Sequence, residues 1–146
     1  MVTRTFALFA SLLIGSTPAL ADTAPACPPA AVGALWPQGA PLAADGRLQV
    51  NTPGQIALQA DADGKHAGSA MVTIDAAGTY AVALGSAAWI DVVKDGALLT
   101  STGHGHGPAC SGIRKIVRFA LQPGIYEVRL SRSERNTAQV LVSAAP

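Results

Sequence analysis

The hydrophobic residues after residue 43 alternate with polar or small residues over short segments, which is the pattern of half-buried β-strands. The alternation predicts strands over residues 55–59, 71–74, 80–84, 89–93, 117–121, 126–130 and 140–142. Turn-forming pairs such as Asp45-Gly46, Asp95-Gly96 and Pro123-Gly124 lie between these segments. No segment has a convincing helical period. We therefore expect an all-β protein, an antiparallel, jelly-roll-like β-sandwich of about seven to nine short strands.

The chain contains a short internal repeat. Residues 78–84 and 124–130 share the pattern Gly-x-Tyr-x-Val-x-Leu. In each copy the glycine forms a turn, and the spacing of two places Tyr, Val and Leu on one face of a strand. The copies predict two equivalent hairpins in opposite sheets of one sandwich. Tyr80 and Tyr126 are predicted to be core residues with hydrogen-bonded hydroxyl groups.

The N-terminal sequence has the parts of a signal peptide. Arg4 supplies a positive charge, residues 6–14 form an apolar run, and Ala19-Leu20-Ala21 is a small-x-small cleavage site. The run is shorter than the ~20 residues that a membrane span needs. We predict an exported protein, periplasmic or secreted. Its predicted organisation is a signal peptide over 1–21, a proline- and alanine-rich arm over 22–44, and the β-sandwich domain over 45–146.

The charge of the chain excludes some classes of partner. Ten basic residues are present with nine acidic ones, and loss of Arg4 with the signal peptide would balance them. There is no basic stripe and no second apolar run of membrane length. We therefore expect no nucleic-acid partner and no membrane span. The local excess at Arg114, Lys115 and Arg118 is interpreted as the solvated face of a strand.

The two cysteines of the chain are Cys27 and Cys110. In an exported protein two cysteines are most simply paired, so we predict a Cys27–Cys110 disulfide. It would tie the N-terminal arm to the end of the segment 103–110. The alternative is two unpaired thiols.

Two of the three histidines, His104 and His106, lie in a short glycine-rich segment. In an extended chain their Cα atoms would be about 6.5–7 Å apart, with both side chains on one side. Both imidazoles would then reach one ion, and such ligands favour copper, zinc or nickel. His66 is the candidate third ligand, with Asp91 and Glu127 as alternatives. The competing interpretation is a surface loop in which both histidines are exposed to solvent.

Several of these segments together resemble a known family. Tyr80 to Leu84, the stretch Trp89-Ile90-Asp91-Val92-Val93-Lys94-Asp95-Gly96, and Pro123-Gly124-Ile125-Tyr126-Glu127-Val128 are similar to the bacterial pre-peptidase C-terminal domain. The resemblance covers roughly residues 70 to 143. It implies a compact secreted β-sandwich that usually accompanies an exported enzyme, although no catalytic domain stands beside it here.

The stretch 89–126 also resembles a group of small exported bacterial proteins without an established role. It carries the sequence His-Gly-His-Gly-Pro-Ala-Cys followed by Ile113-Arg114-Lys115. Members of this group sometimes carry the label homogentisate 1,2-dioxygenase. Enzymes of that type resemble cupins and hold non-haem iron with histidine and glutamate, so the resemblance adds iron to the candidate cofactors. Only the His-x-His element has a counterpart in this chain.

The sequence thus predicts a non-catalytic binding or interaction module. The more specific hypothesis is a transition-metal contact through His104 and His106. One alternative is a protein- or glycan-contacting accessory domain, and another is a cupin-like non-haem iron dioxygenase. No Gly-x-Ser-x-Gly elbow and no phosphate-cradling glycine loop are present, and a disulfide-bonded Cys110 would be a poor nucleophile. No catalytic residue is predicted.

Overall fold

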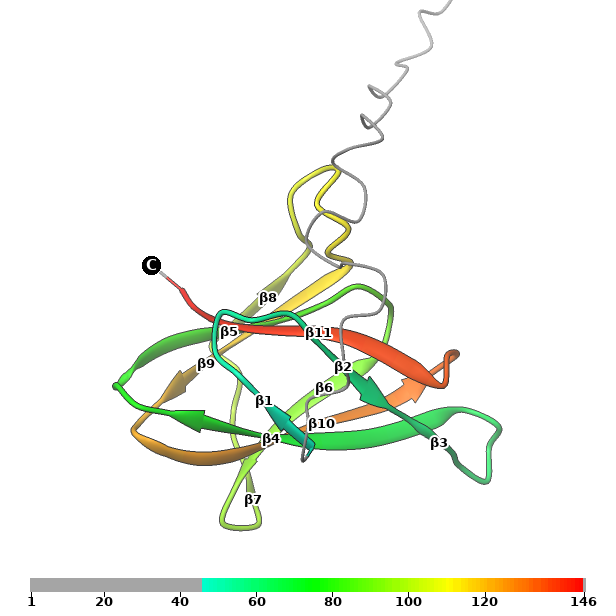
Figure 1. Cartoon of the computed structure of the whole chain (residues 1–146), viewed down its shortest axis with the longest axis horizontal. Helices are drawn as coiled ribbons and strands as arrows, with labels where there is room; N and C mark the ends of the chain where they lie inside the picture. The colour runs from blue at the N-terminus through cyan, green and yellow to red at the C-terminus, as the bar shows by residue number, and fades with distance from the viewer. Residues whose placement is uncertain (1–45, 146) are drawn as a thin grey trace, which may run out of the picture.

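A computed structural model describes residues 46–145, in which β-strands form two sheets that face each other (Figure 1). One sheet has the order β1-β4-β10-β6-β7, with β3 paired to β4, and the other has the order β2-β11-β5-β9-β8. The strands are β1 (Arg47–Leu48), β2 (Gly54–Ala57), β3 (Gln59–Ala60), β4 (His66–Ile74), β5 (Gly78–Leu84), β6 (Trp89–Lys94), β7 (Ala97–Leu98), β8 (Gly103–Gly105), β9 (Lys115–Leu121), β10 (Gly124–Ser133) and β11 (Thr137–Ala144).

The predicted all-β sandwich is confirmed. Neighbouring strands are antiparallel except for β1, which runs parallel to β4. All seven segments predicted from alternation lie in or overlap strands. The additional strands β1, β3, β7 and β8 have only two or three residues each. Such short strands show no readable alternation, which explains why the sequence predicted fewer of them.

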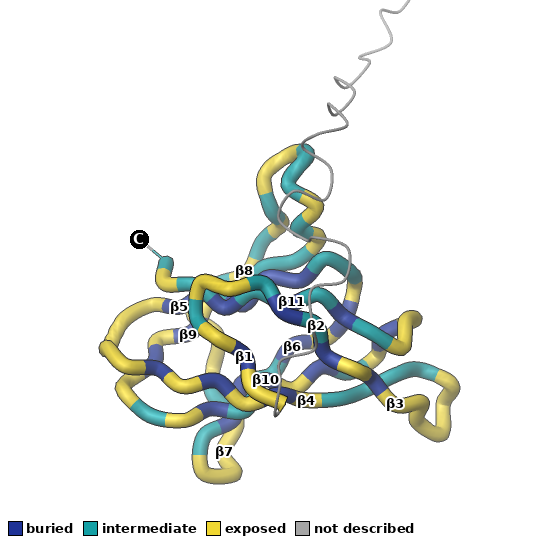
Figure 2. The backbone as a smooth tube through the Cα atoms, viewed as in Figure 1, coloured by how far each residue is buried: buried dark blue, intermediate teal, exposed yellow. Residues whose placement is uncertain are grey.

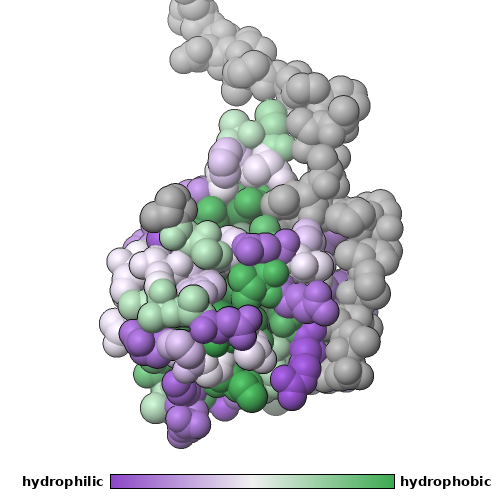
Figure 3. Space-filling view, turned by 60° about the vertical axis from the view of Figure 1, so that its left-hand side comes forward, coloured by the Kyte–Doolittle hydropathy of each residue, from purple (hydrophilic) through white to green (hydrophobic). Residues whose placement is uncertain are grey.

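The core lies between the two sheets, where every second residue of the long strands is buried (Figure 2). In β4 the burial alternates through Ala70, Val72 and Ile74, and in β9 it alternates through Val117, Phe119 and Leu121. Each of these strands therefore offers one apolar face to the opposite sheet and one face to solvent. Hydrophobic and hydrophilic side chains are interspersed over the face seen in Figure 3.

The two copies of the internal repeat lie in opposite sheets, as the sequence predicts, but they do not form the predicted hairpins: the turn before each copy connects two strands of different sheets, β4 to β5 and β9 to β10. The copies themselves form β5 and β10. Both tyrosines are buried, and their hydroxyl groups make the same local contact. Tyr80 Oη donates to the carbonyl oxygen of Ala76, and Tyr126 Oη donates to that of Gln122, each at 2.8 Å. Each tyrosine thus closes the turn that precedes its own strand.

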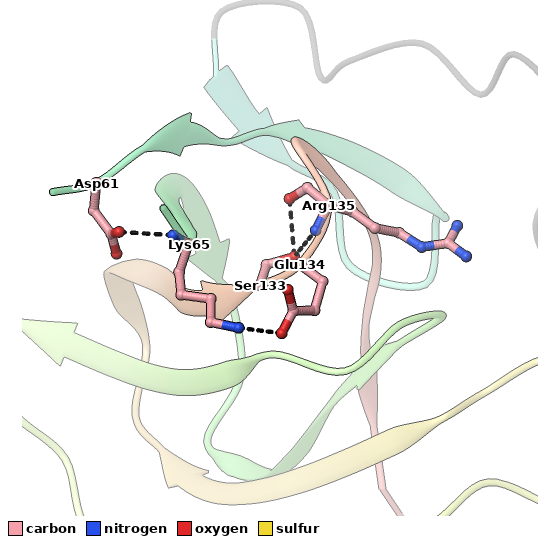
Figure 4. Close-up of polar contacts among 5 residues, drawn as sticks. All are labelled: Asp61, Lys65, Ser133, Glu134 and Arg135. Atoms are coloured by element: carbon pink, nitrogen blue, oxygen red, sulfur yellow. Dashed lines mark hydrogen bonds and ion pairs between the residues drawn. The ribbon is translucent and has the colours of Figure 1, made fainter. Parts of the chain in front are cut away.

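The end of β10 contains a bulge. The register with β4 shifts between Leu130 and Ser133, and Arg132 has a positive φ of 57°. The buried Ser133 hydroxyl stabilises this end by accepting from the backbone N–H of Arg135 and donating to its carbonyl oxygen (Figure 4). A bulge re-aims the side chains beside it. Here it turns Arg132 toward the pocket described below.

Several sequence predictions fall outside the described residues. The signal peptide over 1–21, the arm over 22–44 and Cys27 all lie there, so the Cys27–Cys110 disulfide stays a prediction. Between residues 46 and 145, no helix is long and apolar enough to cross a membrane.

Candidate functional site

A pocket of about 360 Å³ opens at one end of the sandwich. Its walls come from the β5–β6 connection, from β6, from β8, from the start of β9 and from the bulge of β10. We call it the Trp89 pocket. Its lining residues are Ala87, Ala88, Trp89, His104, Gly105, His106, Arg114, Lys115 and Arg132.

Trp89, the first residue of β6, is the aromatic surface of the pocket. Its side chain is 53% exposed although tryptophan is usually well buried. The indole Nε1–H donates to Asp91 Oδ1 at 3.1 Å, which fixes one edge of the ring. Two cations lie over the ring, with Lys115 Nζ at 5.0 Å and Arg132 Cζ at 5.7 Å from its centroid. Both distances are within the range of cation–π attraction.

Strand register explains how Lys115 reaches the pocket. Lys115 pairs with Leu84, as Val117 pairs with Val82. Residues directly opposite each other in an antiparallel pair share a face. Because Leu84 is fully buried, Lys115 lies on the core side of its sheet, at the end of the strand. Its ammonium group donates to the carbonyl oxygen of Ala88 at 3.0 Å, which bridges the two sheets at the pocket.

The predicted pair His104 and His106 lies in and just after the edge strand β8. His104 pairs with Val117, and both histidines line the Trp89 pocket. His106 Nδ1 is 2.9 Å from the carbonyl oxygen of Arg114. A carbonyl only accepts, so Nδ1 is the donor in this contact. When Nδ1 donates in this way, Nε2 is the ring nitrogen that can accept a hydrogen bond or bind a metal.

The structure does not bring the third histidine to this pair. His66 begins β4, where it pairs with Ser133, and it is not among the residues that line the Trp89 pocket. Its Nδ1 is buried without a hydrogen-bond partner. In the part of the chain that the structure describes, no three His, Cys, Asp or Glu side chains are grouped so that they could hold a metal ion.

The two alternative ligands are engaged elsewhere. Asp91 accepts from the Trp89 indole, as described above. Glu127 lies on β10 and forms an ion pair with Arg129, with Oε2 at 2.8 Å from Nη2. The hydrogen bond from Arg129, helped by one from Ser69, lowers the pKa of the Glu127 carboxyl group. Glu127 does not line the Trp89 pocket.

Most of the pocket residues carry no functional signal in the sequence alone. The sequence predicts one solvated strand face at Arg114, Lys115 and Arg118, but Arg114 and Lys115 line the pocket whereas Arg118 does not. The alternation itself carried a signal, because residue 115 shares the period-two spacing of the buried residues of β9. Arg132 lies at the bulge of β10, and no local sequence pattern predicts that bulge.

The lining of the Trp89 pocket is cationic. It includes two arginines and a lysine as well as the two histidines, and it includes no aspartate or glutamate. Like charges that line one open pocket attract anions and repel cations, with a strength that solvent and salt reduce. Sites that bind small molecules combine apolar or aromatic walls with a few convergent polar groups, in volumes of about 300–1,000 Å³. The Trp89 pocket has both properties.

Comparisons with protein families, with curated proteins and with solved structures find no match to this chain. The class of protein is therefore defined by its own architecture. It is an all-β sandwich with a cationic, aromatic pocket at one end.

Proposed function

We propose that this protein is an exported, non-catalytic binding module that takes an anionic ligand in the Trp89 pocket. One observation carries the proposal: Lys115 and Arg132 lie over a half-exposed tryptophan, Arg114 lines the same pocket, and no aspartate or glutamate is among the lining residues. The N-terminal sequence supports a periplasmic or secreted location. The pocket offers an anionic ligand three kinds of contact: positive charge, an aromatic surface and hydrogen-bond donors.

The charge of the pocket can be measured through Trp89 itself. In a Trp36→Phe background Trp89 is the remaining tryptophan, because the chain has two. We expect iodide to quench its fluorescence roughly sevenfold more strongly than caesium does, each relative to its quenching of free N-acetyltryptophanamide, because a local potential of about one kT raises the local concentration of the anion and lowers that of the cation by about e-fold each. The measurement is a pair of Stern–Volmer titrations at constant ionic strength, with acrylamide as the neutral reference.

Two variants connect this preference to named residues. Lys115→Ala combined with Arg132→Ala should bring the iodide and caesium constants close together. Lys94→Ala is the matched control, because Lys94 Nζ also lies 5.0 Å from an aromatic centroid, that of Tyr126, but outside the pocket. Equal quenching by the two ions in the parent protein would contradict an anion-binding pocket.

A metal contact through His104 and His106 is the second candidate function. The observation that favours it is that both imidazoles line one pocket and that His106 keeps Nε2 available. The neighbouring cations weaken this candidate, because their positive charges repel a divalent metal ion bound in the same pocket. Copper is the metal that two imidazoles would hold best, with zinc and iron as the other candidates.

Titration of the mature protein with copper and with zinc tests this second function. If the two histidines hold the metal, His104→Ala/His106→Ala should weaken binding by at least about tenfold, since two-coordinate anchoring is lost. His66→Ala should leave the affinity unchanged if the pair alone suffices and should weaken it if His66 is the third ligand. Equal, weak binding by the parent and the double variant would remove the metal candidate.

The cupin-like iron dioxygenase is not proposed. Non-haem iron oxygenases hold iron with two histidines and one carboxylate. The Trp89 pocket offers two histidines but no carboxylate among its lining residues.

A further inference from the structure

We infer that the ligand of the Trp89 pocket is an acidic sugar, a uronate unit within an oligosaccharide, whose carboxylate binds the cations while its ring stacks on the indole. The inference rests on the proposed anion-binding function and names its ligand class. Three observations carry it: the exposure of the ring, the contacts that hold the ring in place, and the cations beside it in a pocket that is open to solvent.

The first observation is a contrast between two similar contacts. Lys94 and Lys115 each place Nζ 5.0 Å from an aromatic centroid. The ring under Lys94 belongs to Tyr126, which is 2% exposed, so that contact is part of the packing of the sandwich. The ring under Lys115 belongs to Trp89, which is 53% exposed and borders empty space. Only the second contact leaves aromatic surface for a ligand.

The second observation concerns how this surface is held. The hydrogen bond to Asp91 fixes the indole edge, and the Lys115 ammonium group is anchored on the Ala88 carbonyl oxygen. A preorganised aromatic ring loses little entropy when a flat ligand stacks on it. A pyranose ring offers such a face, made of C–H groups, and carries hydroxyl groups around its rim. The histidine ring nitrogens of the pocket are suited to hydrogen bonds with those hydroxyl groups.

The third observation concerns the anion. Lys115 retains donors beyond the one given to Ala88, and Arg132 carries a planar guanidinium group beside it. Arginine matches the two oxygens of a carboxylate by a bidentate contact. A carboxylate at the edge of a sugar ring can therefore meet the cations that lie over the indole, while the sugar ring covers the part of the indole that stays exposed. Because the pocket is open to solvent, the neighbouring units of the oligosaccharide can extend out of it while one unit stays bound.

The test compares trigalacturonate with its methyl ester, which has the same rings without charge, by titration calorimetry on the mature protein. We expect trigalacturonate to bind at least about tenfold more tightly than the ester, as one charge-assisted contact would give. Lys115→Ala/Arg132→Ala should reduce the affinity for the acid to that for the ester, and leave the ester unaffected. Trp89→Ala should weaken both ligands, because stacking does not depend on charge.

Controls separate these effects from loss of folding. Lys94→Ala and Ile125→Ala change a half-buried cation and an exposed apolar residue away from the pocket, and should not alter either affinity. Trp89→Phe keeps a smaller ring and should fall between the parent and Trp89→Ala. All variants are compared by thermal unfolding.

Other outcomes would overturn the ligand class. Equal affinity for acid and ester, or tighter binding of inorganic phosphate or benzoate than of trigalacturonate, would exclude an acidic sugar. If the iodide preference holds while trigalacturonate fails to bind, the ligand class is wrong and the anion-binding function stands. If both fail, both proposals are wrong.

Discussion

Replacing Phe119 with alanine should lower the free energy of unfolding by about 3–5 kcal/mol. Phe119 is the largest of the fully buried side chains, with 2% exposure, and it lies at the centre of β9. Its removal loses buried apolar surface and leaves a cavity between the sheets. Small domains are stable by about 5–15 kcal/mol in total, so this is a large fraction.

Urea unfolding followed by far-ultraviolet circular dichroism measures the effect. Phe119→Leu is the matched control, since it keeps most of the apolar volume, and it should cost a smaller amount of about 1 kcal/mol. The slope of the transition should stay the same in both variants if the folded state is unchanged. A loss below about 1 kcal/mol for Phe119→Ala would mean that the two sheets can close over the cavity.

Replacing Gly107 with alanine should distort the Trp89 pocket. An added Cβ at Gly107 would lie 2.3 Å from Ile113 Cβ and 2.7 Å from the Ile113 carbonyl oxygen. The backbone must therefore move, at a cost of about 1–3 kcal/mol. Gly107 follows His106, and Ile113 precedes Arg114, whose carbonyl oxygen holds the His106 ring. Moving the backbone at residues 107 and 113 should therefore disturb the hydrogen bond between His106 and the Arg114 carbonyl oxygen, which holds this part of the pocket.

We expect Gly107→Ala to change the nuclear magnetic resonance signals of the His106 ring and to reduce the iodide preference of Trp89 fluorescence. Gly103→Ala is the control, because a Cβ there meets no atom within 4 Å. It should leave both readings and the thermal stability near those of the parent. Identical behaviour of the two variants would show that the close approach of residues 107 and 113 does not shape the pocket.

The fold was largely predictable because its main signal is local. Alternation located the long strands, and the repeated Gly-x-Tyr-x-Val-x-Leu pattern placed Tyr80 and Tyr126 correctly in the core. The very short strands were missed, since two residues carry no period. β3 and β7 pair with strands adjacent in sequence, β4 and β6, so they are short arms of local hairpins rather than readable strands of their own.

The candidate site was only partly predictable. His104 and His106 stood out by composition, and the structure brings both to one pocket. Trp89 and Lys115 were placed on strands, but their meeting depends on how two different sheets face each other. Arg132 depends on a bulge. Binding sites built across elements in this way leave little trace in any single stretch of sequence.

The pairing of β2 with β11 has a consequence for when the protein can fold. Ala57 pairs with Thr137 and Gly54 pairs with Val140, so a strand near the start of the described chain is completed by its last strand. Contacts between such distant segments form slowly, because a long loop must close before they contribute. The pairing of β2 therefore cannot form until residues 137–140 have been synthesised. A chain that must cross a membrane before it folds would gain from this delay.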